Sequence, residues 1–237
     1  MEQNIKQTEP LRKIKQIKIT GKIELLSGMR IGGSETLLEI GGVDAGQTCI
    51  KHPTTYKPYI PGSSLKGKMR SEMEKKLGKY RISTNRDGKT IYEPCDCAKC
   101  LVCRVFGPHK VVEHELGPTR LLVRDCQVLE KGDFEIKSST AINRKTNTAL
   151  GGALRTEERV ASGAVFDFRI DLQIWNVDET ECEYEGKKGE QALIEFVKEC
   201  LRLVEQTGIG AGTSKGFGLI KFQLDGGFTL YGEEKSE

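Results

Sequence analysis

The stretch that most restricts the possible folds of this chain is residues 164–174, where apolar side chains occupy every second position. A period of two places alternate side chains on opposite faces of a β-strand, so this stretch predicts a strand with one buried face. Residues 17–25 alternate in the same way. A sheet that is apolar on one face must be covered by another layer.

Two amphipathic helices are predicted to form that layer. An apolar residue recurs every fourth position from residue 65 to residue 77, and Gly78 is expected to end the helix. The methionines in this stripe are interpreted as core packing. A second apolar stripe runs from residue 192 to residue 204.

The order of these elements predicts an α+β fold of the ferredoxin-like, or RRM-like, β-α-β-β-α-β type, which we expect to form a single domain over residues 1–237. The core segments are expected at about residues 15–26, 63–78, 119–130, 163–175, 189–206 and 216–225. Three long insertions, at about residues 27–62, 79–118 and 131–162, separate them. Insertions of this length in a compact domain are usually functional or disordered.

Composition places few restrictions on the partners of the protein. The chain has 37 basic and 34 acidic residues, so a binding site for a polyanion has to be a local patch. No apolar run reaches the roughly 20 residues that cross a bilayer, and the N-terminal residues lack the apolar core of a signal peptide. We therefore expect a cytoplasmic protein with no membrane partner.

The first predicted helix begins with the wrong charges. Helix N-termini favour acidic side chains, yet the segment IPGSSLKGKMR places Lys66, Lys68 and Arg70 there. Ser63 or Ser64 can cap the helix, and the free amides of its first turn then lie beside three cations. The pattern favours an anion site such as a phosphate site; a Ser-capped helix with solvated lysines is the alternative.

A second candidate for phosphate contact is the glycine-rich segment GIGAGTSKGFG, residues 208–218. Gly210, Gly212 and Gly216 would let backbone amides approach a sugar-phosphate chain, and Lys215 adds charge. The alternative is a tight turn that simply requires glycine. The segment is not a P-loop, because the GxxxxGK[ST] spacing is absent.

The third insertion contains three arginines, Arg144, Arg155 and Arg159, among small and polar residues. They predict an arm that carries arginines to a nucleic-acid backbone, with a solvated loop as the alternative. The glycine-rich residues 28–46 contain Arg30 and Asp44. Asp44 by itself is typical of a turn.

Four cysteines within nine residues predict a metal site. Cys95, Cys97, Cys100 and Cys103 have the spacing C-x-C-x₂-C-x₂-C, and thiolates are preferred ligands of structural zinc. If the short span prevents one thiol from reaching the ion, His109 or His114 could replace it. An iron–sulfur cluster and free thiols remain the alternatives, although the spacing differs from the ferredoxin motif.

Taken together, these segments resemble the Csm-type backbone subunit of type III CRISPR effector complexes, in the RAMP superfamily. The resemblance depends on an ordered series of motifs between residues 28 and 222: GMRIGGSE, IGGVD, YIPGSSLKGKMR, CRVFG, INRKT, RTEERV followed by FDF, and GAGTSKGFG. Each motif alone is weak, and their order is specific.

The resemblance implies a palm with a thumb-like β-hairpin formed by the third insertion. It implies that copies of the protein stack into a filament along a guide CRISPR RNA, together with other type III effector subunits. Complementary target RNA would pair with the guide and be cut at regular intervals in a step that needs Asp44 and a divalent metal, Mg²⁺ or Mn²⁺. Guide phosphates would contact the IPGSSLKGKMR helix and the glycine-rich segment.

Two other functions compete with this endoribonuclease. One is an RNA-binding scaffold subunit that cleaves nothing, and Asp44 distinguishes the two. The other is a free-standing zinc-dependent hydrolase, which is disfavoured because closed coordination by four cysteines leaves no position for water.

Overall fold

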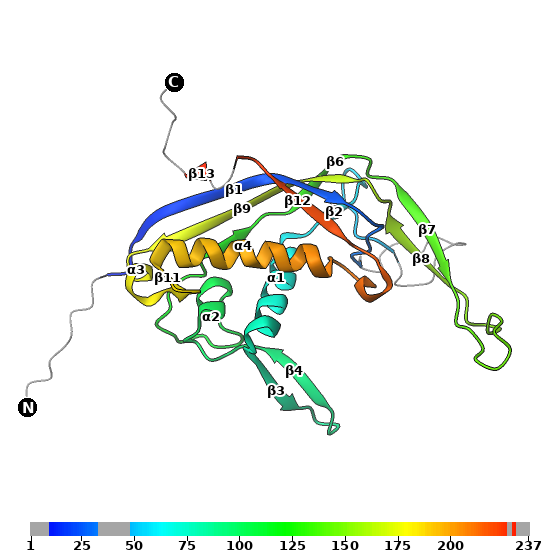
Figure 1. Ribbon diagram of the computed structural model, residues 1–237, viewed down its shortest axis with the longest axis horizontal. Helices are drawn as coiled ribbons and strands as arrows, with labels where there is room; N and C mark the ends of the chain where they lie inside the picture. Colours follow the sequence, from blue (N-terminus) through cyan, green and yellow to red (C-terminus); the bar gives the residue numbers. More distant parts are fainter. Residues whose placement is uncertain (1–9, 33–47, 227–228, 231–237) are drawn as a thin grey trace, which may run out of the picture.

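The computed structural model describes residues 10–32, 48–226 and 229–230, and it has an α+β fold in which helices cover one face of a sheet (Figure 1). The catalytic candidate Asp44 lies outside the described residues. Within the described part of the chain, we find no helix with the length and apolarity needed to span a bilayer.

The sheet is built on two long central strands, β1 (Lys13–Leu25) and β9 (Val165–Trp175). Its strand order is β12-β1-β9-β6-β2, with β13 also paired to β1 and β5 to β9, and every pairing is antiparallel. The outer strands are β12 (Ile220–Leu224), β6 (Cys126–Glu130), β2 (Tyr59–Ile60), β5 (Leu121–Val123) and β13 (Thr229–Leu230).

The register of β1 against β9 explains the alternation in both stretches. Ile19 lies opposite Ile170, and Ile23 opposite Phe166; all four side chains are fully buried. Gly21 interrupts the apolar series because β12 approaches it closely: a Cβ atom there would lie 2.2 Å from the carbonyl oxygen of Gln223.

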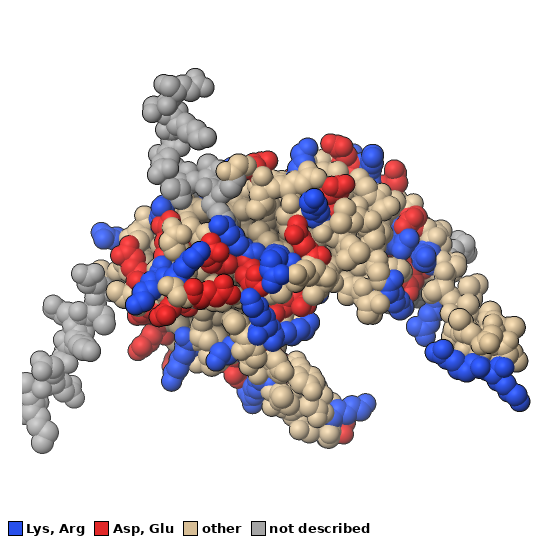
Figure 2. Space-filling view, viewed as in Figure 1, with Lys and Arg blue, Asp and Glu red and all other residues tan. Residues whose placement is uncertain are grey.

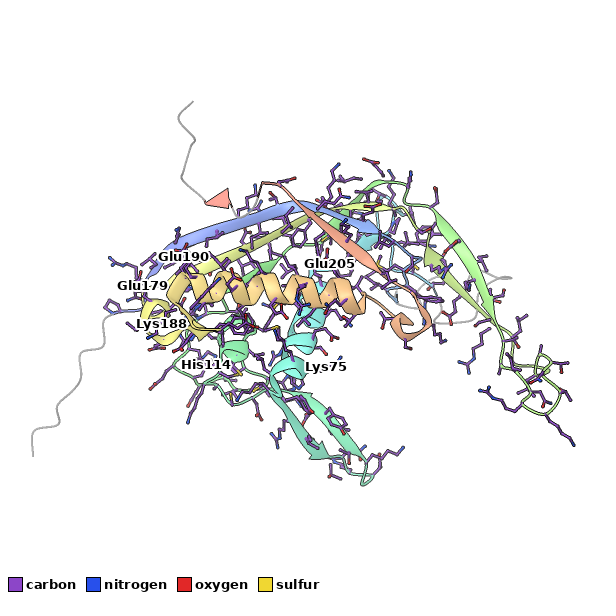
Figure 3. The ribbon with its side chains drawn as sticks, in the orientation of Figure 1. Lys75, His114, Glu179, Lys188, Glu190 and Glu205 are labelled. Atoms are coloured by element: carbon purple, nitrogen blue, oxygen red, sulfur yellow. The ribbon has the colours of Figure 1, made fainter. Side chains whose placement is uncertain are left out.

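Two helices cover the buried face, α1 (Gly62–Leu77) and α4 (Gly189–Thr207), and they lie on the same side of the sheet in Figure 1. Both ends of α4 are fastened to strands. Glu190 accepts hydrogen bonds from Lys15 of β1 at 2.9 and 3.0 Å, and Glu205 accepts one from the backbone amide of Phe222 at 2.7 Å (Figure 3). The predicted methionine stripe of α1 is buried, as expected of core packing.

The predicted strand over residues 119–130 was wrong in one respect, because the structure breaks it into β5 and β6. At the break, Asp125 turns its carboxylate to the start of α1 and accepts a hydrogen bond from the amide of Gly62 at 2.7 Å. The expected serine cap was also wrong: Pro61 is the N-cap residue, and no side-chain cap is made there. The last predicted strand begins at Ile220 rather than at residue 216.

The second and third insertions each contain a β-hairpin that projects from the body of the protein (Figure 1). β3 (Tyr80–Thr84) pairs with β4 (Thr90–Pro94), and the short helix α2 (Leu101–Phe106) follows. β7 (Phe134–Ser139) pairs with β8 (Arg155–Val160). The remaining short elements are α3 (Asp178–Glu181), β10 (Glu183–Tyr184), β11 (Lys187–Lys188) and the 3₁₀ turn η1 (Thr213–Lys215).

A buried ion pair joins the second insertion to the core. The guanidinium of Arg120 and the carboxylate of Asp178 are both fully buried, and they are linked by hydrogen bonds of 2.7 to 3.0 Å. Arg104 of α2 adds a hydrogen bond of 3.3 Å to the same carboxylate. Because an unpaired charge in this position would be costly, the pair fixes the insertion against the end of β9.

Candidate nucleic-acid interface and metal site

Two glycine-rich segments that are far apart in the sequence lie against each other. The amide of Ala211 donates to the carbonyl of Arg30 at 2.7 Å, and the amide of Gly218 donates to the carbonyl of Gly28 at 3.0 Å. Gly210 permits this approach, because it has a φ of +86° and a Cβ atom there would lie 2.3 Å from the carbonyl oxygen of Arg30. The glycines therefore serve close backbone contact as well as turning the chain.

The base of the β7–β8 hairpin completes this junction. Met29 and Val160 exchange backbone hydrogen bonds of 2.8 and 2.9 Å. The guanidinium of Arg159 lies over the ring of Phe217, 4.8 Å from its centroid, and pairs with Glu135 at 2.5 Å. Arg159 is therefore largely buried, and it connects the hairpin to the glycine-rich segment.

A buried carboxylate lies between two of the predicted RNA-binding cations. Glu157 of β8 is 6% exposed, and its carboxylate lies 3.7 Å from Arg30 Nε and 3.9 Å from Lys215 Nζ. Three segments thus contribute charge to one site: the glycine-rich residues 28–32 that follow β1, the hairpin and the 3₁₀ turn. The predicted contact residues Gly210, Gly212 and Gly216 belong to the same glycine-rich segment as Lys215, whereas the five predicted contacts of α1 lie elsewhere.

The hairpin and the glycine-rich segment enclose a hollow of about 550 Å³. Arg155 and Lys215 both line it, and both side chains are exposed. Arg144 is exposed in the loop at the tip of the hairpin, where Figure 2 shows basic side chains gathered. All three cations are therefore exposed, and Lys215 also lies 3.9 Å from the carboxylate of Glu157.

The segment that carries Asp44 starts and ends at the same junction. Gly32 pairs with Cys49, and the amide of Ile50 donates to the carbonyl of Ile31 at 2.8 Å, so the residues that flank 33–47 on either side lie next to each other. On the returning side, Glu158 of β8 accepts from the Cys49 amide at 2.8 Å and pairs with Lys51 at 3.0 Å.

The basic turn of α1 is more occupied by internal partners than the sequence suggested. Lys66 donates to the carbonyl of Leu121 at 3.0 Å, and burial followed by the charge of Arg70 lowers its pKa. Lys68 pairs with Glu72 at 2.8 Å. Ser63 is exposed and Ser64 half-buried. The carboxylate that helix N-termini favour comes from Asp125, in the break between β5 and β6.

The four clustered cysteines are arranged as a metal site. Their sulfur atoms all lie within 4.8 Å of one another, with Cys95 and Cys100 at 3.8 Å and Cys97 and Cys103 at 3.9 Å. Four sulfurs bound to one zinc ion at about 2.3 Å in a tetrahedron lie about 3.8 Å apart. The residues therefore fit zinc, and His109 and His114 are not needed to complete the set.

The thiols of the cluster differ in protonation: burial raises the pKa of Cys95 to about 11 and raises that of Cys103 further, whereas the pKa of Cys97 is lowered. Burial raises the pKa of the Cys97 thiol, but hydrogen bonds from the backbone of Lys99 and Cys100 and from neighbouring thiols outweigh burial and lower the pKa to about 7. Thiolates are the form that binds metal. With four protein ligands the site has no open position for a water, which favours a structural role over hydrolysis.

Sequence reasoning missed four residues of these sites: Glu157, Phe217, Asp125 and Glu74. Glu74 had a visible signal, because it stands four residues after Arg70 on a helix and can pair with it. The other three act across long sequence separations. No local pattern identifies such partners.

Comparisons with known proteins identify related sequences. The profile of the RAMP superfamily matches residues 22–221. The chain is 36% identical over 211 residues to the CRISPR system Cms endoribonuclease Csm3 of Methanocaldococcus jannaschii, an alignment that covers 86% of this chain and 77% of that protein. For Csm3 of Enterococcus italicus the identity is 31% over 230 residues, with 92% and 94% covered.

A solved structure has a similar fold. The crystal structure of the Csm3–Csm4 subcomplex in the type III-A CRISPR-Cas interference complex superimposes with a TM-score of 0.53 at 25% sequence identity. The match covers 90% of this chain and 77% of that chain.

Proposed function

The chain belongs to the RAMP superfamily, and we propose that it is a backbone subunit of a type III CRISPR effector, where it binds guide RNA and cleaves the complementary target RNA. The relatives named Csm3 endoribonucleases support this activity. The solved Csm3–Csm4 subcomplex supports partnership with other effector subunits.

One observation carries the proposal: basic residues from three separate segments meet where the loop containing Asp44 begins and ends. Arg30, Arg155 and Lys215 surround this junction. Cations at one place favour the phosphates of a nucleic acid, and Asp44 belongs to the segment whose flanking residues lie at the same junction.

The domain proposed here is a single ferredoxin-like palm spanning residues 1–237. The strand order β12-β1-β9-β6 with both long helices on one face supports this architecture. The β7–β8 hairpin would be the thumb, inserted into the guide–target duplex, and copies of the protein would stack head to tail along the guide.

The N-terminal turn of α1 is proposed as a second contact for guide phosphates, through Ser63, Ser64, Lys66, Lys68 and Arg70. Arg70 uses three of its five N–H donors internally, at Glu74, Gly107 and Cys95, and two remain for an anion. Lys66 and Lys68 would exchange an internal partner for a phosphate oxygen.

In the proposed reaction, the protein positions the target so that a 2′-hydroxyl lies in line with its own phosphate, and Asp44 acts as a general base or as a metal ligand. A bound Mg²⁺ or Mn²⁺ ion would stabilise charge on the phosphate. The exposed cations of the hairpin would hold the strand in this position.

Reconstitution of the complex with guide RNA tests the cleavage. The wild-type subunit is expected to cut complementary RNA into a regular ladder in the presence of Mg²⁺ or Mn²⁺, and D44A is expected to bind the target without producing the ladder. If D44A cuts normally, the catalyst lies elsewhere and the non-catalytic scaffold is the better description of this subunit.

RNA binding is tested separately from cleavage. In the double variant R155A/K215A, the slope of the logarithm of the RNA association constant against the logarithm of the salt concentration is expected to become shallower by about 0.7 for each lost phosphate contact. K188A is the matched control, since this exposed lysine precedes α4 while Lys215 follows it (Figure 3). Equal slopes for the wild type and R155A/K215A would exclude the hairpin and the glycine-rich segment as an RNA interface.

A further inference from the structure

An ion pair on α1 holds the first cysteine of the metal site by its backbone. Arg70 Nε donates to Glu74 Oε1 at 2.8 Å. The same carboxylate oxygen accepts the amide of Cys95 at 2.9 Å, and Arg70 Nη2 donates to the carbonyl of Cys95 at 2.9 Å. Both polar groups of the Cys95 backbone are therefore bound by this pair.

The same guanidinium also reaches the other end of the cysteine segment. Arg70 Nη1 donates to the carbonyl of Gly107 at 2.8 Å. Gly107 follows α2, and its amide donates to the carbonyl of Cys103 at 2.8 Å. One side chain thus bridges the two ends of the segment from Cys95 to Gly107, which contains all four thiols.

Burial makes these contacts persistent. The side chain of Arg70 is 16% exposed and that of Glu74 is 7% exposed, so solvent competes weakly for their hydrogen bonds. A neighbouring ion pair with the same spacing and the same signs of charge provides a contrast. Lys68 and Glu72 are joined at 2.8 Å on the same helix, and the other cation paired with Glu72 is Lys75, also on α1.

We propose that Arg70 and Glu74 are positioning residues of the cysteine metal site. They hold Cys95 and the end of α2 at the separation that brings the four sulfurs within 4.8 Å of one another. The charge of Arg70 thus serves the metal site, through Glu74 and two carbonyl groups. Outer partners of this kind typically contribute about 10- to 100-fold in metal affinity.

Cobalt substitution of the full-length chain tests the proposal without any RNA. Metal-free protein is titrated with Co²⁺, whose visible absorption reports tetrahedral thiolate coordination, and Zn²⁺ affinity is then measured by competition. R70Q and E74Q are expected to bind zinc about 10- to 100-fold more weakly and to release it faster to a chelator. K68Q and E72Q, the matched control variants, are expected to stay within about twofold of the wild type.

A conservative variant separates positioning from charge. R70K keeps the positive charge, but one ammonium group cannot span Glu74 and two carbonyl groups in the fixed geometry of a guanidinium, so it is expected to show most of the loss of R70Q. Wild-type affinity in R70K would overturn the positioning role, as would wild-type affinity in R70Q and E74Q. If R70Q does not fold, E74Q decides the outcome, because it preserves the size of the side chain.

Discussion

Gly210 and Gly216 allow the docking of the glycine-rich segment to be tested with two nearly matched substitutions. Both residues have positive φ, +86° for Gly210 and +83° for Gly216. A Cβ atom at Gly210 would lie 2.3 Å from the carbonyl oxygen of Arg30, whereas a Cβ atom at Gly216 has nothing within 4 Å. Alanine therefore introduces the same backbone strain at both positions, and a steric clash at only one.

The expected difference follows from these contacts. The left-handed conformation costs an alanine about 1–2 kcal/mol, and this applies to G210A and G216A alike. In G210A the neighbouring backbone must also move apart, which breaks the 2.7 Å hydrogen bond from Ala211 to Arg30, a loss of about 0.5–1.5 kcal/mol before any repacking. In a chain of this size, a loss of 1 kcal/mol lowers the unfolding midpoint by about 2–4 °C. The midpoint of G210A should therefore lie about 1–6 °C below that of G216A, and lower still if repacking adds to the loss.

The measurement is the thermal unfolding midpoint of the isolated subunit, followed by cleavage in the reconstituted complex. We expect G210A to lose more activity than G216A, because its substitution displaces Arg30 and the start of the Asp44 loop. Identical unfolding midpoints for the two variants would show that the segments are not docked as described.

Three further predictions concern the metal site, the core and alkaline pH. C103A is expected to abolish tetrahedral Co²⁺ absorption, which C49A, at a scattered cysteine, should retain; absorption in C103A would refute the four-thiol site. D178N leaves the buried Arg120 charge without its partner and is expected to cost about 3–5 kcal/mol in urea unfolding; a loss under 1 kcal/mol would contradict the pairing. Burial, followed by the charges of Asp167 and Asp125, raises the pKa of the Cys126 thiol from 9.0 to about 12. The neutral thiol therefore contributes its full stabilisation below pH 9, and this contribution falls as the pH rises towards 12. The unfolding midpoint should therefore fall less steeply over this pH range in C126A than in the wild type. Parallel plots of midpoint against pH for the two proteins would contradict this contribution of Cys126.

Much of the fold follows from local patterns. The alternation in residues 164–174 corresponds to the buried face of β9, and the fourfold stripe from residue 65 to 77 to the buried face of α1. The hairpin in the third insertion, β7–β8, was implied by the family resemblance and not by a local pattern. The break between β5 and β6 was not predicted. Asp125 accepts a hydrogen bond from a backbone amide of α1, and the sequence around Asp125 does not indicate that distant partner.

In the candidate site too, local sequence patterns predict some features and miss the contacts between distant residues. The cysteine spacing predicted the cluster of four thiols that could hold a metal ion, because both the residue type and the short separation can be read from the sequence. The sequence also singled out Arg30, Arg155 and Lys215 as separate basic features, without showing that they meet.

The sequence by itself determined the period of each element, the order of the elements and the chemistry available to each segment. These depend on residues within a few positions of one another. Only the tertiary structure decided which charges meet: Glu157 with Arg30 and Lys215, and Arg70 with the backbone of Cys95. The physical reason is that an ion pair depends on distance in space, and the packed sheet and helices set that distance between residues far apart in the chain.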